Sequence, residues 1–194
     1  MSTIITTEFL TIVSGLPRSG TSMMMRMLEA AGMPVIVDHV RTPDEDNPSG
    51  YYEFEPVKHT KEDANWLQGS GGKAVKMVYR LLYDLPKDRF YRVLFMRRNL
   101  DEVLASQRVM LERNGPSSDG ISDEQMSVIF HKELNAFYDW VANQSHIAMI
   151  DVDYNHVQAD ARRELQRVNE FLGDVLDLEA MVEVVDASLY RNRK

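Results

Sequence analysis

A short apolar run, a glycine-rich turn and a helix-forming segment follow one another near the start of the chain. Residues 9–15 (FLTIVSG) are rich in apolar and β-branched side chains and predict a buried strand. Residues 21–32 (TSMMMRMLEAAG) are rich in helix formers, and Gly32 is suited to end the helix that they predict. A strand, a glycine turn and a helix form the opening unit of an α/β fold, so this segment constrains the fold strongly.

The rest of the chain continues this alternation. Further strands are expected over residues 34–38, 73–79, 91–96 and 146–151. Helices are expected over residues 54–68, 100–113, 123–141 and 160–173, with Asn99 and Ser122 as N-caps. We therefore expect a single P-loop-like, three-layer α/β domain over residues 1–194, with a mainly parallel central sheet flanked by helices.

The composition excludes several classes of function. The 194 residues carry a formal net charge of -8, which argues against a general nucleic-acid coat because that function needs a basic surface. The sequence has no cysteine, so disulfides and thiolate zinc sites are excluded. It contains no apolar run of transmembrane length and no recognisable signal peptide. We expect a soluble cytoplasmic protein that binds neither nucleic acid nor a membrane, and we leave the oligomeric state open.

The turn after the first predicted strand resembles a phosphate-binding loop. Gly15 and Gly20 have the spacing of the nucleotide-binding pattern G-x-x-x-x-G-K-[ST], and Ser22 ends the pattern. Thr21 stands where that pattern has lysine, and the nearest cation is Arg18, inside the loop. Backbone amides, a helix N-terminus and the Arg18 fork together predict an anion site. The alternative is a tight strand-to-helix turn that binds no ligand.

A second basic segment follows the strand predicted over residues 91–96. Arg97 and Arg98 come directly after that strand, and Ser106 lies two helical turns further on. The carboxyl ends of parallel strands meet at one edge of a sheet, where ligands of such folds bind. We therefore expect this segment and the glycine loop to border the same pocket.

Three segments of the chain resemble the sulfotransferases that use 3′-phosphoadenosine 5′-phosphosulfate (PAPS). Residues 17–22 (PRSGTS) are similar to the loop with which that family binds the 5′-phosphosulfate, in an arginine-containing form found in tyrosylprotein and many bacterial members. The resemblance implies that the 5′-phosphate and the sulfonate are held by Arg18, Ser19, Gly20, Thr21 and Ser22.

The other two segments extend the resemblance to residue 173. Residues 98–106 (RNLDEVLAS) are similar to the family's 3′-phosphate site, which implies that Arg98 and Ser106 hold the 3′-phosphate, with Arg97 as an alternative or auxiliary cation. Residues 154–173 resemble a late segment of the cytosolic enzymes, whose tyrosine contacts adenine, so Tyr154 inherits that expectation. The family's last phosphate-binding segment is absent, and Arg191 or Arg193 can take its place.

The resemblance does not supply a catalytic base. Lys76 matches the family's catalytic lysine, but Val78 stands at the histidine position, and Met23 stands where many members have an adenine-stacking tryptophan. Arg18 and Lys76 can supply positive charge to the reaction.

Three side chains are candidates for the missing base. They are Glu53, Asp38 and His39, and a base elsewhere in the chain stays open. Each has an ordinary alternative, because a carboxylate at a helix start often only complements the helix dipole and a loop histidine is usually solvated.

These observations predict a sulfotransferase that moves a sulfonate from PAPS to a hydroxyl or amine of an unidentified small molecule, leaving 3′,5′-bisphosphoadenosine (PAP). The resemblance implies no metal. Two rivals stay open: an ATP- and magnesium-dependent small-molecule or nucleotide kinase, which the missing loop lysine disfavours, and a non-catalytic protein that binds PAPS or PAP.

Overall fold

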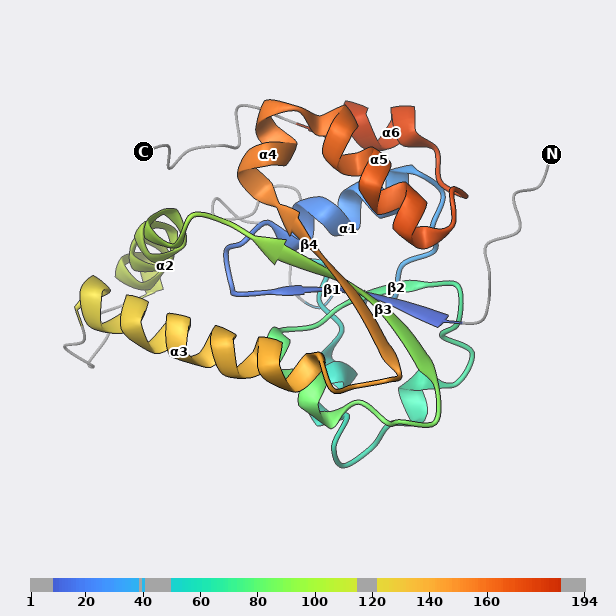
Figure 1. Ribbon diagram of the computed structural model, residues 1–194, viewed down its shortest axis with the longest axis horizontal. Coiled ribbons are helices and arrows are strands. Elements are labelled where there is room, and N and C mark those ends of the chain that lie inside the picture. Colours follow the sequence, from blue (N-terminus) through green and yellow to red (C-terminus); the bar gives the residue numbers. More distant parts are fainter. Residues whose placement is uncertain (1–8, 39, 41–49, 115–121, 186–194) are drawn as a thin grey trace.

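Four parallel strands form the centre of the protein, as a computed structural model shows for residues 9–38, 40, 50–114 and 122–185 (Figure 1). The strands are β1 (Phe9–Gly15), β2 (Ala74–Lys76), β3 (Phe90–Arg97) and β4 (Ile147–Asp153). Their order across the sheet is β2-β1-β3-β4, and every neighbouring pair is parallel.

Helices cover both faces of this sheet. One face carries α1 (Thr21–Ala30), α4 (Tyr154–Ala159), α5 (Ala161–Leu172) and α6 (Leu178–Glu183). The other face carries α3 (Asp123–Val141) and the 3₁₀ helices η1 (Glu55–His59), η2 (Asn65–Leu67) and η3 (Tyr79–Asp84), while α2 (Leu100–Asn114) packs beside α3. The predicted three-layer α/β architecture is therefore confirmed.

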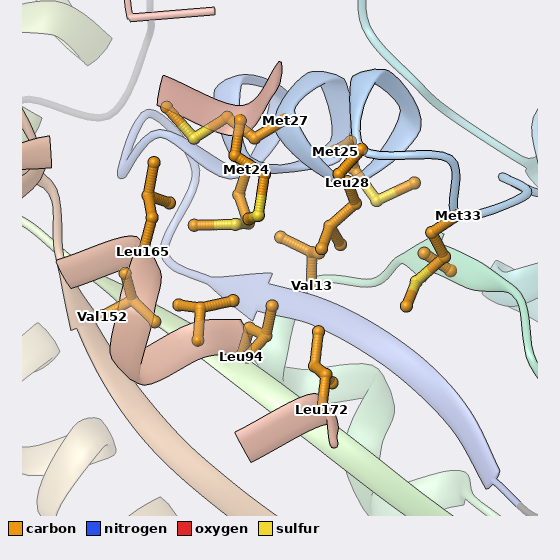
Figure 2. Packing of buried hydrophobic residues seen from close by; sticks show 14 of the residues in the cluster. Val13, Met24, Met25, Met27, Leu28, Met33, Leu94, Val152, Leu165 and Leu172 are labelled. Atoms are coloured by element: carbon orange, nitrogen blue, oxygen red, sulfur yellow. The ribbon is translucent and has the colours of Figure 1, made fainter. Parts of the chain in front are cut away.

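A methionine-rich core holds α1 against the sheet (Figure 2). Met24 and Met27 of α1 are fully buried and belong to the same core as Val13 of β1 and Leu165 of α5. Unbranched methionine side chains adapt to an irregular space between a helix and a twisted sheet. The run of methionines after the glycine loop thus serves packing.

An aromatic core fills the opposite face. Phe95 of β3 stacks on Phe137 of α3, with ring centroids 5.1 Å apart, and Tyr79 meets Phe137 edge-on at 5.7 Å. Side chains alternate between the two cores along each strand, as expected of a sheet buried on both faces.

The strand register brings four chain segments to one edge of the sheet. Val13 of β1 is level with Lys76, the last residue of β2, and Gly15 is level with Met96 of β3. Arg97, at the end of β3, is level with Asp153, at the end of β4. The segments that leave β1, β2, β3 and β4 therefore start side by side.

Two predicted elements are wrong. Residues 34–38 form no strand, because only Val35 bridges to Ala74 of the three-residue strand β2. Residues 54–68 form two 3₁₀ turns instead of one helix. The rings of Phe54 and Trp66 lie 5.8 Å apart, whereas a continuous helix would separate these positions by about 18 Å along its axis.

Within the described part of the chain, no helix is long and apolar enough to cross a membrane.

Candidate functional site

The glycine loop between β1 and α1 has an unusual backbone. Gly15 and Gly20 have φ angles of 145° and 101°, and Arg18 has a φ of 73°, a left-handed conformation that costs a non-glycine residue about 1–2 kcal/mol. Strain of this kind persists where the surrounding structure enforces it, and it clusters at functional sites. The loop therefore holds Arg18 in a conformation that its own side chain disfavours.

Ser19 supplies a buried hydroxyl inside this loop. It is only 1% exposed, and its Oγ has no hydrogen-bond partner among the described residues. A Cβ placed on Gly15 would lie 2.6 Å from that oxygen, so Gly15 leaves the space that the hydroxyl occupies. A buried hydroxyl without a partner is rare in proteins and calls for an explanation, such as a bound ligand or water.

Arg18 joins the glycine loop to helix α2. Its Nε donates to the Ser106 Oγ at 2.9 Å, across 88 residues of sequence. Its carbonyl oxygen accepts from Nη1 of Arg98 at 3.3 Å. The two segments that the sequence predicts to share a pocket are thus in direct contact.

Arg98 lies between β3 and α2 in a buried network. Its Nε donates to Oε2 of Glu102 at 2.9 Å, and the two side chains are only 9% and 3% exposed. The other carboxylate oxygen of Glu102 accepts from Asn155 at 3.2 Å, and Asn155 in turn accepts from the backbone amide of Asn99 at 3.3 Å. The start of α4 is therefore tied to the start of α2.

Tyr154 brings the third segment to the same place. The Arg98 guanidinium lies over its ring, 4.4 Å from the centroid. A Cβ on Gly20 would lie 2.5 Å from Cδ2 of the ring, so the ring edge packs against the glycine loop. Tyr154 is only 5% exposed.

Arg97, the alternative cation, lies in a different cluster. It donates to the Tyr138 hydroxyl at 2.9 Å and to Asp151 at 3.3 Å. Burial and the neighbouring Asp151 carboxylate raise the pKa of Tyr138 above its usual range. Arg97 therefore connects β3 with α3 and β4, and Arg98 is the arginine that contacts Arg18.

Lys76 and Ser22 meet at a backbone carbonyl. Both donate to the carbonyl oxygen of Tyr51, Ser22 at 3.2 Å. The Lys76 Nζ also lies 3.9 Å from Oε1 of Glu53. The end of β2, the first turn of α1 and the segment around residue 53 thus come together. The Lys76 ammonium lies between the Glu53 carboxylate and the Tyr51 carbonyl that the Ser22 hydroxyl also contacts.

Asp38 has a structural role in this arrangement. Its carboxylate accepts from the backbone amides of Glu55 at 2.6 Å and Val40 at 3.0 Å. Its own amide donates to the Glu53 carbonyl at 3.1 Å. Both carboxylate oxygens hold the backbone in place, whereas the Glu53 carboxylate faces Lys76.

The remaining predicted positions are more peripheral. Thr21 and Met23 are half-buried in the first turn of α1, and Val78 is 44% exposed just after β2. His39, Arg191 and Arg193 lie outside the described residues.

A separate hollow of about 350 Å³ lies between α2 and α3. It is lined by Asp101, Leu104, Ala105, Arg108, Asp123, Glu124 and Ser127. None of these is a predicted site residue, and Arg108 is paired with Asp123 at 2.8 Å. The described residues contain no cluster of three or more histidines and carboxylates that could hold a metal ion.

Sequence reasoning missed Glu102, Asn155 and Tyr51. Glu102 follows Arg98 by four residues, and this opposite-charge spacing was the one available signal, although Arg98 itself lies before α2 begins. Asn155 contributes through tertiary contacts and Tyr51 through its backbone carbonyl, so neither leaves a pattern in the sequence.

Replacing Gly20 with alanine is expected to destabilise the protein by about 2–4 kcal/mol, from left-handed backbone strain plus overpacking against Tyr154. Gly32→Ala is the matched control, because Gly32 has a φ of 89° but no atom within 4 Å of an added Cβ. We expect Gly32→Ala to lower the free energy of unfolding by only the cost of the left-handed backbone, about 1–2 kcal/mol. Urea unfolding of both variants measures the difference, and equal losses would show that the Tyr154 ring moves aside freely.

No family model matches the chain, and no curated protein matches it in sequence. In structure it is similar to mouse sulfotransferase SULT7A1, solved in complex with PAP, with a TM-score of 0.56 and 17% identity over 96% of this chain and 68% of that one. At this identity the likeness shows the fold, which is a sulfotransferase-like P-loop fold. A sugar kinase from Janibacter sp. HTCC2649, solved without ligand, has a TM-score of 0.42 and 9% identity over 92% of this chain and 98% of that one, too low to carry an argument.

Proposed function

We propose that the chain is one sulfotransferase-like domain over residues 1–194 that transfers a sulfonate from PAPS to a hydroxyl or amine of a small molecule. One observation carries the proposal. The three segments that resemble the PAPS-binding segments of sulfotransferases contact one another at the carboxyl edge of the sheet, through Arg18, Ser106, Arg98 and Tyr154. The sulfotransferase-like fold supports the same reading.

The glycine loop has the chemistry that a phosphosulfate needs. The Ser19 hydroxyl is buried without a partner among the described residues, and Gly20 begins a helix whose N-terminus favours anions. In the proposal Arg18, Ser19, Gly20, Thr21 and Ser22 bind the 5′-phosphate and sulfonate, and Arg98 and Ser106 bind the 3′-phosphate. Arg191 stays a prediction for the same ligand, because it lies outside the described residues.

The transfer step forms a bond from the acceptor oxygen or nitrogen to sulfur and breaks the bond from sulfur to the 5′-phosphate oxygen. Glu53 accepts the acceptor's proton in this proposal, as the general base. Lys76, 3.9 Å from Glu53, and Arg18 stabilise the negative charge that develops on the oxygens around sulfur. The products are the sulfonated acceptor and PAP.

The acceptor in this proposal is a small molecule rather than a nucleic acid or a membrane. The net charge of -8 leaves little basic surface for a polyanion outside the local anion site. The cytoplasmic location expected from the sequence stays a prediction.

Calorimetric titration with PAP, with ATP plus magnesium, and with ADP as a control tests the donor class. We expect micromolar binding of PAP without a comparable ATP signal, because Thr21 stands where ATP-binding loops have lysine. A preference for ATP with magnesium would contradict the proposal in favour of a kinase. PAP binding without sulfonation of any compound in a panel of small alcohols, phenols and amines would indicate a non-catalytic binding protein.

A further inference from the structure

We propose that Glu102, Asn155 and Tyr154 are positioning residues that fix the Arg98 guanidinium at the glycine loop and thereby set the preference for a 3′-phosphorylated nucleotide. The inference rests on the proposed function, in which Arg98 binds the 3′-phosphate. It assigns to Tyr154 a role other than the adenine contact that the resemblance implies.

Glu102 determines how the Arg98 side chain lies. Arg98 leaves the end of β3 before α2 begins, so the helix backbone does not orient it. The charged hydrogen bond from its Nε to Glu102, at 2.9 Å, fixes the plane of the guanidinium. Both side chains are more than nine-tenths buried, so solvent cannot replace this contact easily.

Asn155 holds Glu102 in turn. Its side-chain Nδ2 donates to Oε1 of Glu102 at 3.2 Å, and its side-chain Oδ1 accepts from the backbone amide of Asn99 at 3.3 Å. The Asn99 side chain caps α2 by accepting from the Asp101 amide at 2.9 Å. Asn155 therefore acts on Arg98 through Glu102 and fixes the carboxylate relative to the start of α2.

Tyr154 supports Arg98 from the side of the glycine loop. The guanidinium lies 4.4 Å from the ring centroid, within the range of a cation–π contact, and the ring edge packs against Gly20. The guanidinium covers one face of the ring and Gly20 meets its edge, so Arg98 and the glycine loop already occupy the surfaces that an adenine base would share. Its position instead sets the spacing between the loop and Arg98, whose Nη1 reaches the Arg18 carbonyl at 3.3 Å.

Comparing the affinities for PAP and for 5′-AMP, which lacks the 3′-phosphate, tests the positioning of Arg98. A misplaced Arg98 weakens PAP binding more than AMP binding, whereas a general disturbance of the site weakens both equally. We expect Glu102→Ala to lower the ratio of PAP to AMP affinity by about tenfold and Asn155→Ala by a smaller factor. Glu102→Gln keeps an acceptor for the Arg98 Nε, so it should retain most of the ratio. His156→Ala is the matched control, since its side chain is 70% exposed on α4 beside Glu164 of α5.

A double-mutant cycle tests whether Glu102 acts through Arg98. In the Arg98→Ala background, Glu102→Ala should leave the ratio unchanged, because the group that it positions is gone. Circular dichroism and thermal unfolding establish that each variant is folded. If Glu102→Ala does not fold, Asn155→Ala provides the same comparison, and Glu102→Gln stays the variant that should retain the ratio.

Tyr154→Leu separates the two roles of the tyrosine. A support for Arg98 predicts that PAP binding weakens more than AMP binding, whereas an adenine platform predicts equal weakening of both.

The outcomes separate the inference from the proposed function. A wild-type protein that binds neither nucleotide overturns the proposed function, and this inference with it. A wild-type protein that binds PAP, with equal losses of PAP and AMP in Glu102→Ala and Tyr154→Leu, overturns this inference alone.

Discussion

Replacing Glu53 with glutamine is expected to lower kcat for sulfonate transfer by about 10²–10⁴-fold, the range that a general base contributes. PAP affinity should stay within about twofold of wild type, because the change removes a proton acceptor and no anion-binding group. The side chain keeps its shape, and Lys76 keeps its hydrogen bond to the Tyr51 carbonyl. The measurement is the rate of transfer from PAPS to an acceptor found by panel screening.

Two further carboxylates serve as comparisons for Glu53. Glu55→Gln is the matched control, because Glu55 lies two residues away and pairs with Lys58 on the surface. Asp38→Asn should mainly lower stability, since its carboxylate holds the Glu55 and Val40 amides. A larger loss of kcat in Asp38→Asn than in Glu53→Gln would reverse this assignment.

Replacing Arg18 with alanine should weaken PAP binding by about 10²-fold or more, since roughly 1.5–3 kcal/mol is expected from each lost charged hydrogen bond. The free energy of unfolding should fall by about 1–3 kcal/mol, because the variant also loses the charged hydrogen bond to the buried Ser106 hydroxyl. A variant that is still folded by urea unfolding separates this loss of stability from the loss of PAP binding. Isothermal titration with PAP measures the first effect and urea unfolding the second.

Arg162→Ala is the control for the loss of an arginine. Arg162 of α5 is exposed and pairs with Glu179 of α6 on the surface. Neither residue belongs to the proposed site, so PAP binding should be unchanged. Arg18→Lys keeps the charge but not the planar fork, and we expect an intermediate affinity. PAP binding that survives Arg18→Ala would remove the glycine loop from the proposed site.

Local sequence patterns predicted the elements that local interactions determine. The first strand has the expected bounds, Phe9–Gly15, and α3 begins with the expected capping box between Ser122 and Gln125. Gly173 ends α5 with a left-handed φ of 101°. In each case the residues that form the sequence signal also make the contact that it predicts, within a few positions of one another.

Tertiary contacts decided the elements that were predicted wrongly. Residues 34–38 have a strand-like composition, but β2, to which Val35 bridges, is three residues long, and Asp38 turns away to hold Glu55. Between residues 54 and 68, the side chains of Thr60 and Asp63 bond to nearby backbone groups and compete with a regular helix.

The candidate site was predicted to the level of segments and not of contacts. The parallel sheet implied that the glycine loop and Arg98 would meet, and they do. The resemblance assigned the 3′-phosphate to Arg98, with Arg97 as an alternative or auxiliary cation, and Arg98 is the one that contacts the Arg18 carbonyl. Tyr154, whose ring lies under Arg98, and Asn155, which bonds to Glu102, come from α4, more than 50 residues further along the chain, and only the folded chain brings them together.

The order of the strands makes the site a product of complete folding. Its parts leave β1, β3 and β4, which are separated along the chain and joined only by parallel pairing, a slow and long-range step. A ligand that contacts all of these segments therefore binds the native protein, in which the whole sheet is formed, and not a folding intermediate that lacks part of it. At a hundredfold excess over its Kd it adds about 2.7 kcal/mol to the stability of the whole sheet. A rise in melting temperature can thus identify donors and acceptors before any turnover assay exists.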